Sequence, residues 1–416
     1  IKNIPLIKPR SQNDTPPSSI SGDEVTGMDE EGVFLGYLDE MEELMDDHME
    51  ETSDQEEEDA DMEPPEDHSI LAFTKHVGSV FCCDLHPNGK FAVTGGEDDK
   101  AFVWSVQTGQ VILECTGHKD SVIFVGFSSD GAYLATADMS GLIKVWKCNL
   151  EENQQDPWPV AFEYEAEDLT FGLWHFGARV LICGAVSGDI YVFKIPTGDT
   201  KVLQGHNTRV ECAKMFKDGV RLAAGYDDGA VKVWDLKTNT VQQQIQANVH
   251  DMRVTAIDTH PENNLMASIS SDGKVILATS SNGKIVGQLQ AENDLETVAF
   301  AQDPELGLFA LGTLNGEVGV WDIARQMVRH QCTKADDESV IGVTKMVWVK
   351  NHLVTGCLDG AIRVYEGRSG EKVLQLTGHR SEVLDLCYND NENIILTTSD
   401  DSSARIYKYD INKEKV

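Results

Sequence analysis

Short runs of alternating apolar and polar residues follow one another along the chain from about residue 68 onward. Each run comes after a turn rich in Asp, Gly or Asn, and such alternation predicts a β-strand with one buried face. Eight of the runs are alike, and they end at Trp104, Trp146, Phe193, Trp234, Ala278, Trp321, Tyr365 and Tyr407. Successive end positions are 41 to 47 residues apart. This period predicts eight copies of one small β-sheet.

A second marker lies upstream in several of the repeats. Gly-His pairs occur at 117–118, 205–206 and 378–379, and His76 and His250 keep the histidine without the glycine. Four short strands in a repeat of about 40 to 45 residues are typical of one blade of a β-propeller. We therefore predict an all-β fold, an eight-bladed propeller.

The two ends of the repeat region indicate how the ring closes. The propeller is predicted to occupy residues 68–416, and the apolar segment 70–73 precedes its first repeat. That segment has no earlier blade to join. It is expected to pair with the strand that ends at Tyr407 in the last blade, which removes the free sheet edge.

With these markers the sequence resembles the WD-repeat proteins, which fold as rings of four-stranded blades. In that family a histidine, an aspartate of the turn between the second and third strands, and the tryptophan that ends the third strand form a hydrogen-bonded structural set. The resemblance implies this role for His76, Asp98, Trp104, His118, Trp146, His206, Asp228, Trp234, His379 and Asp401. Ser140 and Asn315 stand where aspartate is expected, so the networks of these two blades are expected to be weaker or different.

The chain is strongly acidic, with a formal net charge of −36. Residues 1–67 hold 23 acidic and 3 basic side chains, and residues 68–416 hold the other 47 acidic and 31 basic ones. Both parts would repel phosphate backbones, which argues against direct binding of nucleic acid and favours a basic protein as the partner.

Residues 1–67 are predicted to be an acidic, mostly disordered arm. Segment 51–67 has ten carboxylates in seventeen positions and no basic residue, so it cannot bury enough apolar surface to fold alone. Two interpretations stay open. The arm could extend the reach of the propeller for a basic partner or guard an empty site, or it could only keep the protein soluble.

Several function classes find no support in the sequence. The chain has nine cysteines, no two of them form a C-x-x-C pair, and most lie in apolar runs. This pattern indicates free thiols in a reducing compartment, which is the cytosol and also the nucleus. No apolar run reaches the roughly 18 residues of a membrane span. The His, Asp and Ser residues near 117–131 could suggest a hydrolytic triad, but the same His and Asp recur in several repeats, as scaffold residues do, and no nucleophile motif is present. We predict a monomer that is not an enzyme and carries no metal or cofactor.

The loops that carry the Gly-His pairs and the turns between second and third strands are expected to meet on one face of the ring. They are rich in carboxylates, and the candidates for partner binding are Glu97, Asp99, Asp120, Glu167, Asp168, Asp227, Asp251, Glu338, Glu382 and Asp400. Loops are polar in any protein, so this pattern alone leaves open whether the residues bind anything. Carboxylates gathered on one face would create a negative potential that attracts a basic peptide.

Longer stretches of sequence indicate which family of WD-repeat proteins the chain resembles. SVFCCDLHPNGKFAVTGGEDDKAFVW, GHKDSV, ATADMSGLIKVW and VRHQC, behind an acidic arm, resemble the angio-associated migratory cell protein family. The yeast counterpart of that family is a dedicated chaperone of a basic large-subunit ribosomal protein. The resemblance implies a chaperone that holds the N-terminal segment of such a protein on an acidic loop face for ribosome assembly. The alternative is a signalling or cytoskeletal scaffold that acts in cell migration.

Overall fold

The computed structural model describes residues 66–150, 158–245, 249–262, 264–291, 293–332 and 341–410. The predicted arm therefore lies outside the described residues except for Glu66 and Asp67, and so does the candidate site residue Glu338.

The described residues form eight four-stranded antiparallel sheets, which confirms the eight-bladed propeller. Blades 1 to 4 consist of β2 (Val80–Leu85), β3 (Phe91–Gly96), β4 (Ala101–Ser105) and β5 (Val111–Cys115); β6 (Val122–Phe127), β7 (Tyr133–Asp138), β8 (Leu142–Lys147) and β9 (Val160–Glu165); β10 (Leu169–Trp174), β11 (Val180–Ala185), β12 (Ile190–Lys194) and β13 (Asp199–Leu203); β14 (Val210–Met215), β15 (Arg221–Tyr226), β16 (Val231–Asp235) and β17 (Thr240–Gln244).

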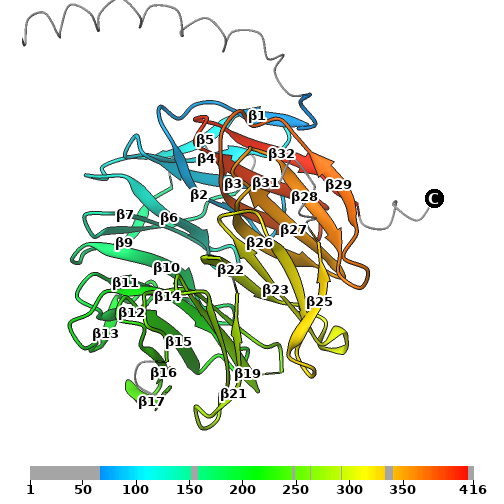
Figure 1. The fold of residues 1–416 in the computed structure, drawn as a ribbon. Helices are drawn as coiled ribbons and strands as arrows, with labels where there is room; N and C mark the ends of the chain where they lie inside the picture. Colours follow the sequence, from blue (N-terminus) through cyan, green and yellow to red (C-terminus); the bar gives the residue numbers. More distant parts are fainter. Residues whose placement is uncertain are drawn as a thin grey trace, which may run out of the picture. The chain divides into compact units, whose positions relative to one another are not determined.

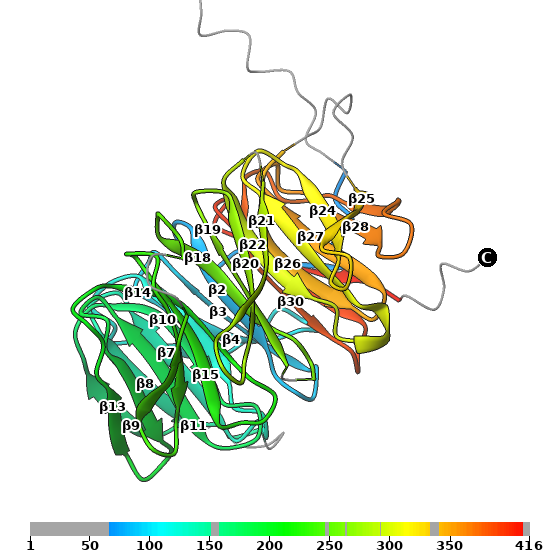
Figure 2. The same ribbon diagram turned by 60° about the horizontal axis from the view of Figure 1, so that its bottom comes forward.

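The other four blades complete the ring. Blades 5 to 8 consist of β18 (Val254–Thr259), β19 (Leu265–Ser270), β20 (Lys274–Thr279) and β21 (Ile285–Gln290); β22 (Leu295–Phe300), β23 (Leu308–Thr313), β24 (Val318–Asp322) and β25 (Met327–Gln331); β26 (Val343–Val349), β27 (His352–Cys357), β28 (Ile362–Glu366) and β29 (Lys372–Leu376); β30 (Val383–Asn389), β31 (Ile394–Ser399), β32 (Ala404–Lys408) and β1 (Leu71–Phe73). A 3-10 turn, η1 (Pro304–Leu306), connects β22 to β23. Figures 1 and 2 show the blades following one another in chain order, from blue to red.

The sheet of blade 8 contains strands from both ends of the propeller chain. β1 pairs antiparallel with β32, with Leu71 opposite Ile406 and Phe73 opposite Ala404. Figure 1 shows this blue strand beside the red one. Phe73 also stacks on Trp104 of blade 1, with ring centroids 4.7 Å apart, so the closing strand is held by packing as well as by its backbone bonds.

The strand that begins each blade carries a β-bulge near its start, in all eight blades among the described residues. In blade 1 the register shifts between Val80 and Cys82, and in blade 8 between Val383 and Asp385. Bulges re-aim side chains and increase local twist. The bulged residues of blades 8, 1 and 2, which are Leu384, Phe81 and Ile123, line a cavity of about 480 Å³ between the innermost strands.

Apolar packing between neighbouring blades provides the core. One cluster joins Val93 and Val103 of blade 1 to Val125, Leu134 and Trp146 of blade 2, and each of these five side chains is buried. Burial of each such side chain stabilises the fold by roughly 1.5 to 3 kcal/mol.

Among the described residues, no helix is long and apolar enough to cross a membrane.

The structural set implied by the WD-repeat resemblance is present in blade 1. His76 Nδ1 is 2.9 Å from Asp98 Oδ1, and its Nε2 is 2.9 Å from Thr94 Oγ1. Trp104 Nε1 donates to the same Thr94 hydroxyl at 3.3 Å. Blade 8 keeps the first part of this arrangement, with His379 Nδ1 at 3.0 Å from Asp401.

Blade 4 has a variant of the set. His206 contacts Asp228 at 2.9 Å as expected, but through Nε2, and Lys232 Nζ lies 2.9 Å from its Nδ1. Trp234 Nε1 donates to the Tyr226 hydroxyl at 3.1 Å. Tyr226 thus accepts from the tryptophan as Thr94 does in blade 1, but it meets His206 through a ring contact, with centroids 4.6 Å apart.

The network of blade 2 is different from that of blade 1, as expected, but it is complete. Asp138, the last residue of β7, accepts from His118 at 3.1 Å, and His118 and Trp146 both contact Thr136, at 2.8 and 3.2 Å. Ser140, at the expected aspartate position, donates to Asp138 at 2.8 Å. The carboxylate comes from the end of the strand instead of the turn, so the set is complete. In blade 6, Asn315 donates to Asn293 at 2.9 Å, which is a different network, as expected.

The pKa of Asp138 is consistent with a complete hydrogen-bonded set in blade 2. Burial by itself raises the pKa of this carboxyl, but hydrogen bonds from His118, the Lys119 N–H, Ser140 and the Leu142 N–H lower its pKa to about 2. The carboxylate is therefore ionised and held by four donors in the interior of blade 2.

Candidate functional site

Two sets of loops meet at one end of the strands and carry the predicted binding carboxylates. The turns between second and third strands contain Glu97, Asp227 and Asp400, and the loops that enter the first strands contain Asp168 and Glu382. Backbone bonds join the two sets within a blade: the Glu97 N–H donates to Ser79 at 2.9 Å, and the Asp400 N–H donates to Glu382 at 3.1 Å. The same bonds occur at Val186 with Asp168 and at Asp227 with Arg209, both at 2.9 Å.

We call this surface the acidic face; its carboxylates among the described residues are Glu97, Asp99, Asp120, Glu167, Asp168, Asp227, Asp251, Glu382 and Asp400. Glu167 is half-buried and the other eight are exposed. The structure thus brings onto one face all the predicted site residues that it describes. Glu338 lies outside the described residues.

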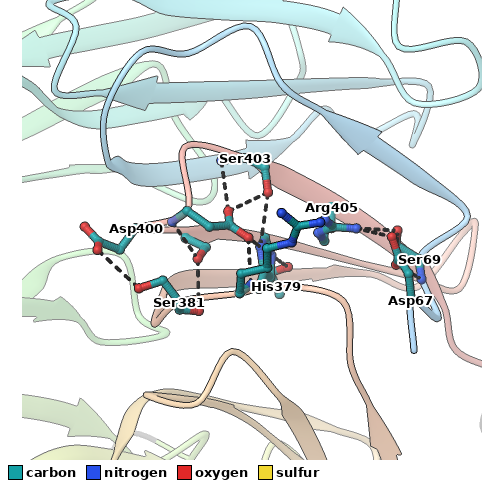
Figure 3. A network of polar contacts seen from close by, with 11 residues as sticks. Asp67, Ser69, His379, Ser381, Asp400, Ser403 and Arg405 are labelled. Carbon is teal, nitrogen blue, oxygen red and sulfur yellow. Dashed lines mark hydrogen bonds and ion pairs between the residues drawn. The ribbon is translucent and has the colours of Figure 1, made fainter. Parts of the chain in front are cut away.

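Ser79 draws two of these carboxylates together at the junction of blades 1 and 8. Its backbone N–H donates to Glu97 Oε2 at 3.0 Å, and its hydroxyl donates to Asp400 Oδ1 at 2.5 Å. The Ser381 hydroxyl donates to the other oxygen of Asp400 at 3.2 Å, as Figure 3 shows. Two carboxylates from different blades are thereby fixed close to each other, and among the described residues no ion pair is formed by either.

The closing strand is anchored beside the same junction. Arg405 of β32 forms an ion pair with Asp67 and lies 3.2 Å from the Ser69 hydroxyl (Figure 3). The His68 N–H donates to Thr377 at 2.9 Å. Asp67, which the sequence assigns to the arm, therefore already contacts the propeller.

Two of the basic side chains in these loops, Lys100 and Lys119, are paired with carboxylates away from the face. Lys100 is 2.8 Å from Glu114 of β5, and Lys119 is 2.7 Å from Glu165 of β9. Both partners lie on the outermost strand of a blade. These pairs direct the two ammonium groups outward, and they leave the carboxylates of blades 1 and 2 uncompensated.

Two predicted site residues are less available than the others. Asp251 forms an ion pair with Lys274, so much of its charge is compensated locally. Glu167 accepts from the Ser187 hydroxyl at 2.5 Å and from the Tyr191 hydroxyl at 3.2 Å. Burial, together with this carboxylate, raises the pKa of Tyr191 to about 12.

The innermost strands contain a different ionic contact. Lys345 Nζ lies 3.2 Å from Asp385 in the wall of the 480 Å³ cavity, next to Cys83. Burial raises the pKa of Asp84, in the same wall, to about 7. In the part of the chain that the structure describes, no group of three or more His, Cys, Asp or Glu side chains is arranged to hold a metal ion.

Known proteins share the repeats of this chain. The WD domain, G-beta repeat family model matches residues 68–105, 109–147, 198–235 and 370–408. The angio-associated migratory cell protein of Homo sapiens is 35% identical over 366 residues, which covers 83% of this chain and 81% of that protein. The chain belongs to the angio-associated migratory cell protein family.

More distant relatives match most of the chain. Ribosome assembly protein SQT1 of Saccharomyces cerevisiae is 25% identical over 382 residues, which covers 84% of this chain and 85% of that protein. A crystal structure of Chaetomium thermophilum Sqt1 bound to the N-terminus of the ribosomal protein L10 superposes with a TM-score of 0.75 at 21% identity. It covers 82% of this chain and 100% of that chain, and the likeness shows the same fold.

In this member of the angio-associated migratory cell protein family, sequence reasoning missed the apolar part of the acidic face. The first turn residue after the second strand is Glu97, Asp227 or Asp400 in blades 1, 4 and 8. At the same position blades 2, 3 and 6 carry Met139, Val186 and Leu314, which are 47%, 40% and 42% exposed. The eightfold period could have located these positions, because each stands at the same place in its repeat.

Proposed function

We propose that this protein is a non-catalytic chaperone that holds the basic N-terminal segment of a large-subunit ribosomal protein on the acidic face. The observation that carries the proposal is the pair Glu97 and Asp400, both hydrogen-bonded to Ser79 and belonging to different blades. A peptide crossing this junction would meet both carboxylates at once. The work would take place in the cytosol, and in the nucleus.

Charge and geometry favour a basic peptide over a folded basic domain. The carboxylates lie at the tips of short loops around the ring, with the exposed apolar side chains of Met139 and Val186 between them. An extended segment can place Lys or Arg side chains on the carboxylates and apolar ones between them. Electrostatic complementarity of this kind mainly accelerates association and sets specificity, and salt weakens it.

What two relatives are known by also supports the chaperone proposal. Sqt1 carries the name of a ribosome assembly protein in Saccharomyces cerevisiae, and its Chaetomium thermophilum counterpart was crystallised with the N-terminus of ribosomal protein L10. For this chain, the identity of the client and its register on the acidic face belong to the proposal.

A binding measurement tests it. A fluorescein-labelled peptide with the N-terminal sequence of the organism's own L10-type ribosomal protein is titrated with the purified full chain. We expect Glu97→Gln with Asp400→Asn to weaken binding by roughly a hundredfold, since each removed contact is worth about tenfold. The matched control Glu305→Gln with Asp390→Asn removes the same charge from exposed residues in the turns at the opposite end of the strands, and it should leave binding nearly unchanged.

Capture from translating cells separates this function from the alternative. The full chain should enrich one large-subunit ribosomal protein, and charge reversal by Glu97→Lys with Asp400→Lys should abolish the enrichment. The family name favours a scaffold in cell migration as the second candidate. Enrichment of membrane-associated or cytoskeletal proteins that survives the charge reversal would support the scaffold and contradict the chaperone.

A further inference from the structure

A groove with a volume of about 670 Å³ separates blades 3 and 4 at the end of the strands opposite the acidic face. Its floor is apolar and includes Val180, Val192, Ile195 and Leu236. Ile195 and Val192 are buried and Val180 and Leu236 are half-buried. A groove of this size and character is within the range of sites that bind small molecules or peptide side chains.

Two contacts between the blades border the groove. His175 Nε2 lies 2.9 Å from the Gly219 carbonyl oxygen, and Lys201 Nζ donates to the Lys237 carbonyl oxygen at 3.4 Å. The first contact joins the turn after β10 to the turn after β14. The second joins β13 to the turn after β16. The opening between the two blades is therefore a fixed feature of their packing.

The rim of the groove is basic in a protein that is otherwise acidic. The lining contains Arg179, Lys194, Lys201 and Lys237 against one carboxylate, Asp199. Arg179 Nε forms an ion pair with Asp130 at 2.7 Å. Lys194, Lys201 and Lys237 are exposed, and within the described residues none of the three is in an ion pair.

We propose that this lysine groove, lined by Lys194, Lys201, Lys237 and the four apolar floor residues, is a second binding site that takes an acidic peptide segment with a bulky apolar residue. The apolar side chain would enter between Val192 and Leu236. Carboxylates on either side of it would meet the lysine ammonium groups. Two sites of opposite charge on opposite ends of the strands let one propeller hold a basic and an acidic partner together.

The chemistry of the lining favours a peptide over a nucleic acid. Residues 68–416 carry 47 acidic and 31 basic side chains, so only the local charge of the rim attracts an anion, and a long polyanion of any kind is repelled beyond it. The lining contains no Phe, Tyr or Trp, and its aromatic ring, His175, is already stacked on Phe176 and in contact with the Gly219 carbonyl oxygen. A short acidic segment needs only the local charge of the rim and gains from the apolar floor.

A direct titration tests the site. The probe is a fluorescein-labelled peptide with a Leu-Phe pair between two runs of Glu, titrated with the full chain at low salt. We expect Lys194→Glu, Lys201→Glu and Lys237→Glu together to weaken binding by at least tenfold. The matched control changes three exposed lysines in turns at the same end of other blades, by Lys90→Glu, Lys284→Glu and Lys350→Glu, and it should keep most of the affinity.

Two further arms separate this proposal from the function of the acidic face. Glu97→Gln with Asp400→Asn should leave the acidic probe bound, and the three lysine changes should leave the basic ribosomal peptide bound. Equal loss of the acidic probe in the lysine variant and its control would overturn the proposal, because only net charge would then matter. Tighter binding of single-stranded RNA or inorganic phosphate than of the acidic peptide, lost in the lysine variant, would also overturn it.

Discussion

The hydroxyl of Ser79, which precedes the first strand of blade 1, donates to Asp400 of blade 8 at 2.5 Å. Since the backbone N–H of Ser79 also holds Glu97, one small residue positions two carboxylates from the two ends of the chain. Both carboxylates lie where blade 1 meets blade 8, whose sheet β1 completes. Closure of the ring therefore brings residues 97 and 400 together although the chain keeps them far apart.

Ser79→Ala separates the contribution of charge from that of the hydrogen bond. The variant keeps both carboxylates and loses one bond at an exposed position, which is worth about 1 kcal/mol. We expect less than a threefold change in affinity for the basic ribosomal peptide, whereas Asp400→Asn should weaken it about tenfold. Fluorescence anisotropy at two salt concentrations measures both variants. A loss in Ser79→Ala as large as in Asp400→Asn would mean that position, and not charge, dominates.

Lys274→Met should strengthen binding of the basic peptide. Lys274 compensates Asp251, and methionine keeps the apolar stem while it removes the ammonium group. The freed carboxylate adds negative charge to the acidic face, so we expect a gain of roughly threefold that disappears at high salt. The double variant Lys274→Met with Asp251→Asn is the control, and it should return to the affinity of the unmodified protein or below.

Asp138, and not Ser140, is predicted to support blade 2. Asp138→Asn removes a buried, ionised acceptor that serves four donors, so we expect a loss of about 2 to 4 kcal/mol in the free energy of unfolding. Ser140→Ala removes one donor and should cost less than about 1 kcal/mol. Urea unfolding followed by tryptophan fluorescence measures both. Equal losses of stability in the two variants would mean that Ser140, at the turn position, supports blade 2 as much as Asp138 does.

His250 is predicted to make stability depend on pH. Burial lowers the pKa of this ring to about 4, although Asp272 opposes the shift, while an unfolded histidine has a pKa of about 6.5. As the pH falls between these values, the unfolded chain takes up the proton first. The free energy of unfolding should therefore decrease by up to about 3 kcal/mol from pH 7 to pH 4 and stay flat above pH 7.

The variant His250→Gln isolates this effect from other groups. Glutamine can keep a hydrogen bond to the Ser268 hydroxyl, which lies 2.8 Å from His250 Nε2, and it does not titrate. The slope of the unfolding free energy between pH 4 and 6.5 should become shallower in this variant. An unchanged slope would assign the pH dependence to other side chains.

The period of the chain was sufficient to predict the blades, because each blade is a local antiparallel sheet that repeats one pattern. The end positions from Trp104 to Tyr407, which are aromatic in seven blades and Ala278 in blade 5, mark one strand in each of the eight sheets. Local pattern was insufficient in blade 2. There Asp138 replaces the turn aspartate from two positions earlier, and only the folded end of β7 brings it to His118.

The sequence by itself determined that this is an acidic eight-bladed propeller with carboxylates in the loops of one face. Repeat spacing and charge are properties of the chain itself, and both can be read from the sequence. The tertiary structure alone decided which charges remain uncompensated. Lys274 forms an ion pair with Asp251, whereas Glu97 and Asp400 accept from Ser79 and form no ion pair among the described residues. It also placed Lys194, Lys201 and Lys237 around one groove, because blade packing joins residues that the chain keeps apart.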